Sequence, residues 1–278
     1  MTKVVLITGA SDGIGLEIAR QSVAMGYAVF MLARDPDRLR RAAETVPGEK
    51  RPRFVSVDLT DERALDEFFI GMDEAELVPD ILVNNAGIGT TGAFADESWE
   101  KLDALFKLNM LATSRLNHWA VSRMIKRGSG AIVNMSSAVA NRPSPWFAAY
   151  AASKAFINSL SQALHVEAKP HGVSVSVIHP PEVRASSMVN RRKADLSSTL
   201  ALRLLPSVSE YAVAKAVLNA AHKGKRSVAL GVVTWAAMAT AGKLPAGLDL
   251  MLMSMLFRHR PWLARSDHPQ TATRSVRD

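Results

Sequence analysis

The segment "KVVLITGASDGIGLEIAR", residues 3–20, places a glycine-rich turn between an apolar run and a helical stretch. The apolar run is nearly continuous, which is typical of a β-strand that is covered on both faces. The glycines permit a tight turn and let backbone N–H groups approach a pyrophosphate, where the start of the next helix adds positive potential. The segment therefore predicts a strand, a phosphate-binding turn and a helix that begins near Ile14.

The glycines of this turn are spaced G-x-x-x-G-x-G, whereas the common dinucleotide fingerprint is G-x-G-x-x-G. Glycines also make ordinary turns, but this position between a clear strand and a clear helix favours a binding role. We expect a dinucleotide cofactor to contact the loop residues Gly9, Ser11, Asp12, Gly13, Ile14 and Gly15.

The rest of the chain alternates short apolar runs with helical stretches. Strands are expected at residues 3–10, 27–34, 53–59, 80–87, 130–137, 173–180 and 227–233. Long helices are expected at about residues 14–25, 36–45, 98–124 and 147–168. This alternation predicts a single α/β domain of Rossmann type, a doubly wound parallel sheet of about seven strands with helices on both faces. Ligands of such sheets bind beyond the carboxyl ends of the strands.

Capping signals mark where helices begin. Asp35 is expected to cap the second helix, because Pro36 follows it at the first helical position. Thr60 is expected to cap the third helix. Ser207 and Glu210 have the spacing of a capping box, which predicts another helix that ends near residue 222.

The bulk composition limits the classes of partner. The 278 residues are 48% hydrophobic and 22% charged, which is typical of a soluble globular protein. Cysteine is absent, so disulfides and Cys-ligated metals are excluded, and we expect no metal site. The net charge of +8 suits a phosphorylated cofactor, an acyl carrier, an acidic membrane or nucleic acid, although solvated basic faces explain most of it. No recognition motif supports nucleic acid.

The C-terminal region contains the most apolar tract of the chain, residues 228–257. Lys243, Pro245 and Asp249 interrupt it, and neither piece reaches the ~20 residues that a membrane-spanning helix needs. We therefore predict a cytoplasmic protein with residues 1–242 as the dinucleotide-binding and catalytic domain. Residues 243–278 form an apolar and basic extension that packs on the core, on a second subunit or on a membrane interface. Burial is favoured, because apolar Met-rich helices are more often buried than membranous.

The end of the second strand faces the adenosine ribose in folds of this type, and the sequence there reads Ala33-Arg34. Arg34 is a planar donor that suits the 2′-phosphate of NADP. Asp35 would suit the 2′-OH of NAD, but its capping role already explains it. Arg34 therefore favours NADP over NAD, and the alternative is a surface ion pair with Asp35 or Asp37.

Tyr150 and Lys154, in "YAASK", lie four residues apart on a predicted helix and so share one face. An ammonium group beside a phenol favours the phenolate, which makes Tyr150 a plausible proton donor and acceptor. The alternative is a Tyr packed between helices and a Lys that extends to solvent. The strand that ends in "NMSS" precedes Tyr150 by thirteen residues and adds a hydroxyl that could polarise the same substrate carbonyl.

These motifs together resemble the short-chain dehydrogenase/reductase family. The matching elements are "TGASDGIG", "VDL" around Asp58, "NNAG" at 84–87, Asn109 in "KLNML", Ser137 in "MSSAV" and "YAASK". They follow the family's order and spacing over about residues 3–185.

The resemblance implies a role for each matching residue. Tyr150 would be the general acid in ketone reduction, and Lys154 would hold the nicotinamide ribose. Ser137 would position the substrate oxygen, with Ser136 the weaker choice, and Asn109 would anchor a water of the proton relay. The cofactor-binding set would further include Asp58 at the adenine, Leu59, Asn85, Ala86, Gly87, Pro180 and Val183.

The sequence departs from the family pattern after the sixth strand. The family usually has Pro-Gly-x-Val-x-Thr, but this chain has "PPEVRAS", with Pro181 for the Gly and Ala185 for the Thr. The Thr commonly contacts the nicotinamide carboxamide, so Ser186 or Ser187 would have to replace it, or backbone groups would serve alone.

Substrate choice in the family comes mostly from the segment after the sixth strand, here residues 184–208. Its Leu-rich part could form an apolar lid beside the basic cluster Arg191, Arg192 and Lys193, or the cluster could be a solvated turn. The expected activity is NADP(H)-dependent interconversion of a lipophilic or acyl-type ketone and a secondary alcohol by a homodimer or homotetramer. The alternative is a non-catalytic NADP(H)-binding sensor or scaffold, which would have no need for Tyr150 as a proton donor.

Overall fold

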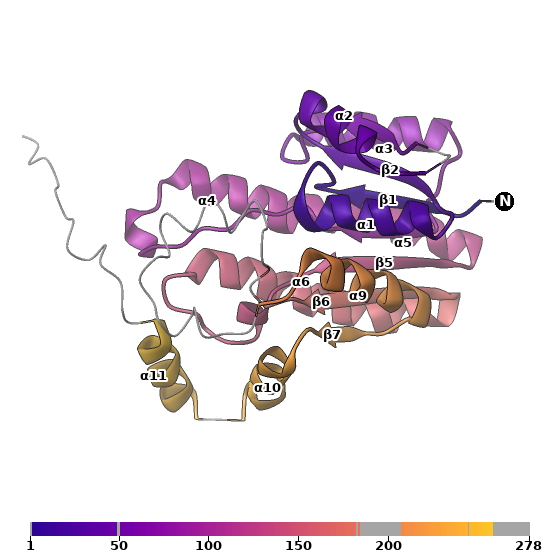
Figure 1. Ribbon diagram of the computed structural model, residues 1–278. Coiled ribbons are helices and arrows are strands. Elements are labelled where there is room, and N and C mark those ends of the chain that lie inside the picture. Colours follow the sequence, from indigo (N-terminus) through magenta and orange to yellow (C-terminus); the bar gives the residue numbers. More distant parts are fainter. Residues whose placement is uncertain (1, 49–50, 182, 184–206, 244, 258–278) are drawn as a thin grey trace, which may run out of the picture.

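The computed structural model describes residues 2–48, 51–181, 183, 207–243 and 245–257. Its centre is a seven-stranded parallel sheet in the order β3-β2-β1-β4-β5-β6-β7 (Figure 1). This topology confirms the predicted Rossmann-type α/β fold. The strand order reverses between β1 and β4, and doubly wound sheets bind ligands in the crevice at such a point.

The strands lie close to the predicted ranges. They are β1 (Val4–Thr8), β2 (Ala28–Ala33), β3 (Arg53–Ser56), β4 (Ile81–Asn84), β5 (Gly130–Met135), β6 (Val173–His179) and β7 (Ser227–Ala229). The helices are α1 (Gly13–Ala24), α2 (Pro36–Glu44), α3 (Glu62–Glu74), α4 (Trp99–Phe106), α5 (Thr113–Arg127), α6 (Ala148–Ala168), α9 (Glu210–Lys223), α10 (Val232–Thr240) and α11 (Ala246–Phe257). The short elements are η1 (Phe94–Asp96), the π-helix η2 (Lys107–Ala112), η3 (Ala138–Asn141) and η4 (Lys169–His171).

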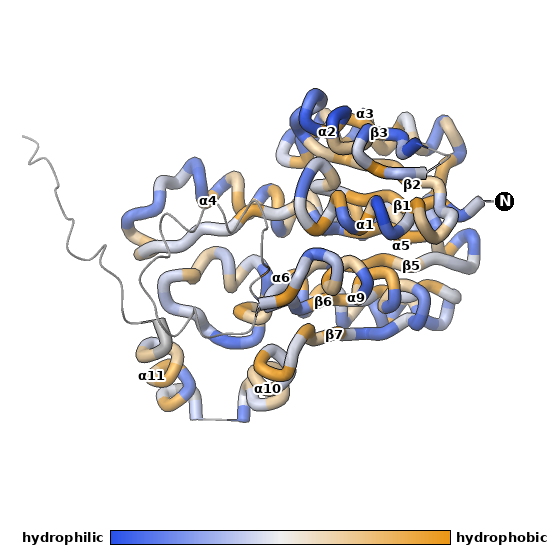
Figure 2. The backbone as a smooth tube through the Cα atoms, in the orientation of Figure 1, coloured by the Kyte–Doolittle hydropathy of each residue, from blue (hydrophilic) through white to orange (hydrophobic). Residues whose placement is uncertain are grey.

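The sheet is buried on both faces, as the apolar run of β1 predicts. Val5 and Ile7 belong to the core under α1, α2 and α9, whereas Leu6 between them belongs to the core under α3, α5 and α6. Successive strand residues point to opposite faces, so an unbroken apolar run serves both cores. Figure 2 shows this hydrophobic centre between more polar outer helix faces. Each large side chain that is fully buried contributes about 1.5–3 kcal/mol.

Two of the predicted caps are wrong by one or two residues. Asp35 caps α2 as predicted, with its carboxylate accepting from the N–H of Arg38. Asp61, rather than Thr60, caps α3, and its carboxylate accepts from two backbone N–H groups. The hydroxyl of Thr60 instead donates to the carboxylate of Asp58 at 2.7 Å. A charged carboxylate is the stronger acceptor at a helix N-terminus, so the cap falls one residue later.

The cap of α9 is Ser209, whose hydroxyl accepts from the N–H of Ala212 at 3.2 Å. The predicted capping box of Ser207 and Glu210 is therefore wrong, because Glu210 is itself the first helical residue. The predicted helix over residues 98–124 is also not uniform, since the π-helix η2 separates α4 from α5 and the last turn extends to Arg127.

The C-terminal helices α10 and α11 lie beyond β7, at the lower edge of Figure 1. Within the residues that the structure describes, no helix is long and apolar enough to cross a membrane. The predicted division of the chain at residue 242 stays a prediction. The segment 184–206, with the proposed lid, basic cluster and replacement serines, lies outside the described residues, as does the tail after Phe257.

Candidate active site

The turn after β1 has the geometry of a phosphate cradle. Gly9 and Gly13 adopt positive φ angles of +65° and +54°, which favour glycine. A Cβ on Gly15 would lie 2.3 Å from the carbonyl oxygen of Gly9, so the loop closes onto the start of α1 through a position that admits no side chain. Asp12 caps α1 by accepting from the N–H of Gly13 at 2.8 Å. A dinucleotide pyrophosphate therefore fits this helix N-terminus, where Ser11 and Ile14 complete the loop.

A network of four hydrogen bonds joins this turn to the segment after β4. The hydroxyl of Thr8 accepts from the backbone N–H groups of Asn85 and Ala86, both at 3.0 Å. The amide of Asn85 donates to the carbonyl oxygens of Thr8 at 3.0 Å and Gly9 at 3.2 Å. This network holds the ends of β1 and β4 together and so fixes one wall of the crevice where the strand order reverses.

The end of β2 presents two arginines to this region. Arg34 is exposed, and its carbonyl accepts from the hydroxyl of Ser56 at 2.8 Å. Arg38, one turn into α2, forms an ion pair with Asp12 in the glycine loop. Arg38 was not predicted from the sequence, because its partner Asp12 is 26 residues away along the chain. Asp58 and Leu59, after β3, lie at the same carboxyl edge, where Asp58 accepts from Thr60.

Asn109 lies in the π-helix η2, a rare element that often marks functional sites. Its side chain is 1% exposed. It accepts from the N–H of Ile88 at 3.0 Å and donates to the carbonyl of Ile88 at 2.8 Å. Its amide also donates to the hydroxyl of Ser153 at 3.0 Å, which connects η2 to α6. Asn109 therefore fixes the chain after β4 against the helix that carries Tyr150.

Tyr150 and Lys154 face the same site from α6. The ammonium Nζ of Lys154 lies 5.8 Å from the centroid of the Tyr150 ring and donates to the carbonyl of Met135 at 2.9 Å. A Cβ on Gly87 would lie 3.2 Å from both this Nζ and Oδ1 of Asn109. The structure thus brings Asn109 and Lys154 together at Gly87, where a side chain would crowd both of them, and Tyr150 lies next to Lys154.

The two serines after β5 have different surroundings. Ser136 is buried, and its hydroxyl donates to the carbonyl of Lys154 at 2.9 Å. Ser137 is half-buried and caps η3, with its hydroxyl accepting from the N–H of Val139 at 3.4 Å. The N–H of Ala138 donates to the carbonyl of Pro180 at 3.0 Å, which places the end of β6 beside the serine.

Two buried polar features near this site were not predicted from the sequence. His179, at the end of β6, is buried, and its Nδ1 lies 3.4 Å from the carbonyl oxygen of Ser137. Burial lowers the pKa of His179 below its ordinary value of 6.5. The amide of Asn84 donates to Asn134 at 2.8 Å, and Asn117 also bonds to Asn134. Asn84 and Asn134 are directly paired in the register of β4 and β5, so these amides fix that register under the site.

Glu210 approaches the phosphate cradle from the start of α9. Its Oε1 would lie 3.2 Å from a Cβ on Gly13, and this oxygen is buried without a hydrogen-bond partner within the described part of the chain. Burial raises the pKa of Glu210 above its ordinary value of 4.5, and the nearby Asp12 and Glu17 raise it further. The phosphate cradle therefore contains a carboxyl group whose ionised form is destabilised by its surroundings.

Replacing Glu210 with Gln is expected to raise the melting temperature at neutral pH by a few degrees. Because the pKa of Glu210 is higher in the folded protein than in the unfolded chain, the folded protein binds the proton more tightly than the unfolded chain does. Wild-type stability therefore falls as the pH rises from about 4.5 through the raised pKa, and it stays lower above that pKa. Thermal melts between pH 4.5 and pH 8 should show a difference that grows with pH. Glu167→Gln, on the exposed face of α6, is the control, and an equal gain at pH 4.5 would contradict the explanation.

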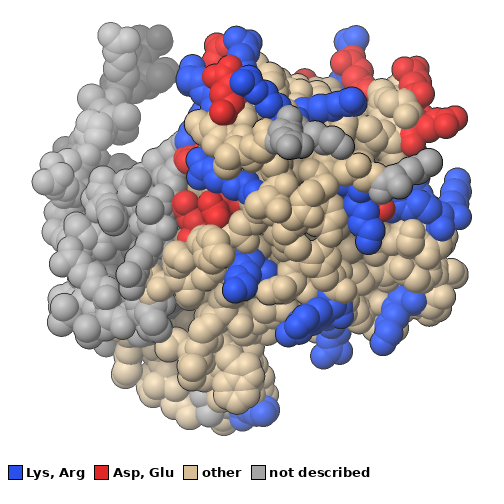
Figure 3. All heavy atoms as spheres, turned by 45° about the vertical axis from the view of Figure 1, so that its right-hand side comes forward, with Lys and Arg blue, Asp and Glu red and all other residues tan. Residues whose placement is uncertain are grey.

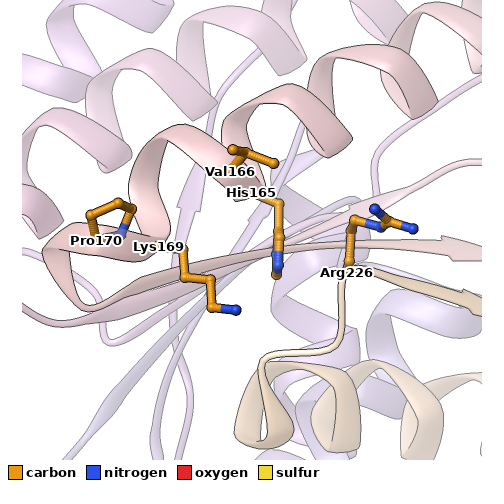
Figure 4. Close-up of a pocket in the computed structure, with 5 residues that line it drawn as sticks. All are labelled: His165, Val166, Lys169, Pro170 and Arg226. Carbon is orange, nitrogen blue, oxygen red and sulfur yellow. The ribbon is translucent and has the colours of Figure 1, made fainter.

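A surface hollow of about 700 Å³ lies at the opposite edge of the sheet (Figure 4). Its lining residues are His165, Val166, Lys169, Pro170 and Arg226. Lys169 and Pro170 precede β6, and Arg226 precedes β7, so the hollow is at the amino ends of these strands. It is therefore separate from the site at the carboxyl ends. Among the described residues, no group of three or more His, Asp or Glu side chains is placed to hold a metal ion.

One β-bridge joins two described residues that lie on either side of positions 184–206 in the sequence. Val183, after β6, forms a parallel bridge with Val208, which precedes α9. Val183 and Val208 are therefore paired beyond the carboxyl end of β6, close to Pro180.

Known proteins are similar to this chain in sequence and in fold. The family model described as short chain dehydrogenase matches residues 3–197. A fatty acyl-CoA reductase of Acinetobacter baylyi is 31% identical over 264 residues, which cover 93% of this chain and 85% of that protein. A short chain dehydrogenase of Pseudocercospora fijiensis is 35% identical over 188 residues, which are 66% of this chain and 60% of the length of that protein.

A solved structure of a short-chain dehydrogenase from Sphingobium yanoikuyae, in complex with NADPH, is also similar. Its TM-score is 0.75 at 30% identity, and the match covers 91% of this chain and 95% of that one. These matches confirm the resemblance in the sequence motifs and the expectation of an oxidoreductase that acts on CH–OH or keto groups with a nicotinamide cofactor. The chain belongs to the short-chain dehydrogenase family.

Proposed function

We propose that this protein is an NADP(H)-dependent carbonyl reductase or alcohol dehydrogenase for a lipophilic or acyl-type substrate. The observation that carries the proposal is that Lys154 and Asn109 meet at Gly87, while the ammonium group of Lys154 lies 5.8 Å from the centroid of the Tyr150 ring. The relative that is named a fatty acyl-CoA reductase supports an acyl-type substrate. The neighbour that was solved with NADPH supports the cofactor.

The residues that would hold the cofactor form two groups along the crevice. The N-terminus of α1, with Gly9, Gly13 and Gly15, would bind the pyrophosphate, and Arg34 would bind the 2′-phosphate. Lys154 would bind the nicotinamide ribose beside Gly87, Asn85 and Ala86 would line the cleft, and Pro180 and Val183 would contact the nicotinamide end. Bound in this way, the reduced nicotinamide would supply a hydride to the substrate carbonyl carbon.

The proton would come from Tyr150. Its hydroxyl would donate the proton to the carbonyl oxygen in reduction and accept it in oxidation. The positive charge of Lys154 near the ring would stabilise the phenolate that remains. Ser137 would donate a hydrogen bond to the same oxygen, whereas the hydroxyl of Ser136 is already used by the carbonyl of Lys154. Asn109 would hold α6 in position through its hydrogen bond to the hydroxyl of Ser153.

Steady-state oxidation of NADPH with a panel of lipophilic ketones and 3-oxoacyl thioesters tests this proposal. Turnover with at least one member of the panel is expected. A protein that binds NADPH with no turnover of any member would instead match the sensor or scaffold alternative. Binding of NADPH is measured separately by the change in its fluorescence, so that the two outcomes are distinguished.

Replacing Arg34 with Ala is expected to raise the KM for NADPH about tenfold and to leave the KM for NADH nearly unchanged. The loss corresponds to about 1.4 kcal/mol, which is typical of a charge-assisted hydrogen bond. Arg41→Ala, at an exposed position of α2, is the matched control. An unchanged ratio of the two KM values in the Arg34 variant would show that Arg34 does not select the cofactor.

A further inference from the structure

The helices α10 and α11 expose a large apolar surface. We define the C-terminal apolar surface by the exposed apolar residues of both helices, among them Val232, Trp235, Leu248, Leu250, Leu252 and Met255. Val232 is 79% exposed, Trp235 is 64% exposed and Met255 is 55% exposed. The sequence of α10 contains no charged residue, and the only one in α11 is Asp249. Apolar residues concentrated on two helices in this way differ from the single exposed apolar residues that are normal on a protein surface.

Both helices are fixed to the loop that begins at Ser137. Arg142, at the end of η3, forms an ion pair with Asp249 of α11, and each of these side chains is 12% exposed. The same guanidinium donates to the carbonyl of Ala237 in α10 at 3.4 Å and to the hydroxyl of Thr240. The exposed surface is therefore held in a defined position by a largely buried ion pair.

The surface is also connected to the candidate active site. Met253 of α11 packs against the apolar cluster that contains Phe147 and Tyr150. The inner side of α11 thus contacts the walls of the site, while its outer side is exposed.

The exposed apolar residues are spread around α11. Leu248 and Leu250 are 41% and 48% exposed, and they lie on opposite flanks because two residues turn the helix by about 200°. Lipid acyl chains adapt to apolar residues that are spread in this way, and an apolar helix surface enters the boundary between the head groups and the acyl chains of a membrane. Trp235, with an apolar ring and a polar N–H, is typical of the interfacial zone.

Charge around the surface points to an anionic membrane. Lys243, in the connection between α10 and α11, is exposed, and the sequence after α11 continues with Arg258 and Arg260. The lower half of the face in Figure 3, on the side of α10, shows Lys and Arg without an acidic side chain. We propose that the C-terminal apolar surface docks on an anionic lipid membrane. Delivery of a lipophilic substrate from that membrane to Tyr150 further rests on the proposed function.

Flotation of the full-length chain with lipid vesicles tests the docking without any enzyme assay. We expect it to float with vesicles of phosphatidylcholine and phosphatidylglycerol, less with phosphatidylcholine alone, and less at high salt. The variant Val232→Ser/Trp235→Ser/Met255→Ser should reduce the bound fraction by about tenfold or more, because each change removes apolar contact. The matched control Ile70→Ser/Trp99→Ser/Val166→Ser changes three equally exposed residues of α3, α4 and α6 and should float like the wild type.

Several results would overturn the proposal. Failure of the wild type to float, equal flotation with neutral vesicles, or equal flotation of the triple variant would each do so. If the wild type did not float but formed a dimer that the triple variant lost, the surface would be a subunit interface. Circular dichroism melts show whether the variants remain folded. Turnover of a short water-soluble ketone by the triple variant separates loss of docking from failure of the proposed chemistry.

Discussion

Replacing Tyr150 with Phe is expected to lower kcat for ketone reduction by about a thousandfold, within the range that general acid–base catalysis contributes. The ring of Tyr150 is 8% exposed and packs in an apolar cluster with Phe147 and Leu105, so Phe preserves the contacts of the ring. The variant loses the hydroxyl that would protonate the carbonyl oxygen. The affinity for NADPH should stay within about twofold, since Lys154 and the glycine cradle are unchanged.

The measurement is a single-turnover reaction with enzyme in excess, which separates the chemical step from product release. Tyr211→Phe is the matched control, because Tyr211 lies on α9 and is 59% exposed, away from the apolar cluster that contains Tyr150. A Tyr150 variant with wild-type kcat would remove Tyr150 from the chemistry. A variant that lost NADPH affinity together with kcat would show that the tyrosine serves binding instead.

Replacing Gly15 with Ala is expected to abolish detectable NADPH binding and to lower the melting temperature by roughly 2–12 °C. The new Cβ would lie 2.3 Å from the carbonyl oxygen of Gly9 and 2.7 Å from the amide nitrogen of Asn85. The first of these is backbone, so the loop itself must move. Overpacking of this kind costs about 1–3 kcal/mol, and about 1 kcal/mol corresponds to 2–4 °C in a domain of this size.

Gly71→Ala is the matched control for this change. Gly71 lies in α3, and a Cβ there would meet nothing within 4 Å. Ala is the better helix former by about 0.5–1 kcal/mol, so this variant should melt slightly higher than the wild type. If Gly15→Ala bound NADPH as the wild type does, the glycine loop would not be the pyrophosphate site.

Much of the fold could be predicted because its elements carry strong local patterns. The continuous apolar runs of β1 and β4 mark strands buried on both faces, and the glycine turn marks the first crossover. Tyr150 and Lys154 could be paired because one helical turn joins them. Each of these features depends on residues that are close together in the sequence.

The errors arose where neighbouring candidates differ little in energy. Asp61 and Thr60 are both good caps, as are Ser207 and Ser209, and differences of about 1 kcal/mol select between such residues. The π-helix around Asn109 has no local signal, because the same residues would form an ordinary α-helix. The π-helix occurs where Asn109 forms hydrogen bonds to Ile88 and Ser153. The sequence alone does not show that these two residues lie close to Asn109.

The features that depend on distant contacts were the least predictable. Arg142 and Asp249 are 107 residues apart, and their ion pair attaches α11 to η3. The sequence favoured burial of the C-terminal helix, but the structure buries only the side that carries Asp249 and Met253. Glu210 approaches Gly13 because α9 packs against α1, which no local pattern reveals.

Transfer of deuterium to a lipophilic ketone, from NADPH that carries deuterium at both hydrogen positions of nicotinamide C4, follows the proposed chemistry from cofactor to product. Mass spectrometry of the alcohol should show deuterium on the carbinol carbon with the wild-type protein. The Tyr150→Phe variant should bind the labelled cofactor with unchanged affinity but transfer deuterium about a thousandfold more slowly. An alcohol without deuterium, or transfer at the wild-type rate by the variant, would contradict hydride transfer assisted by Tyr150.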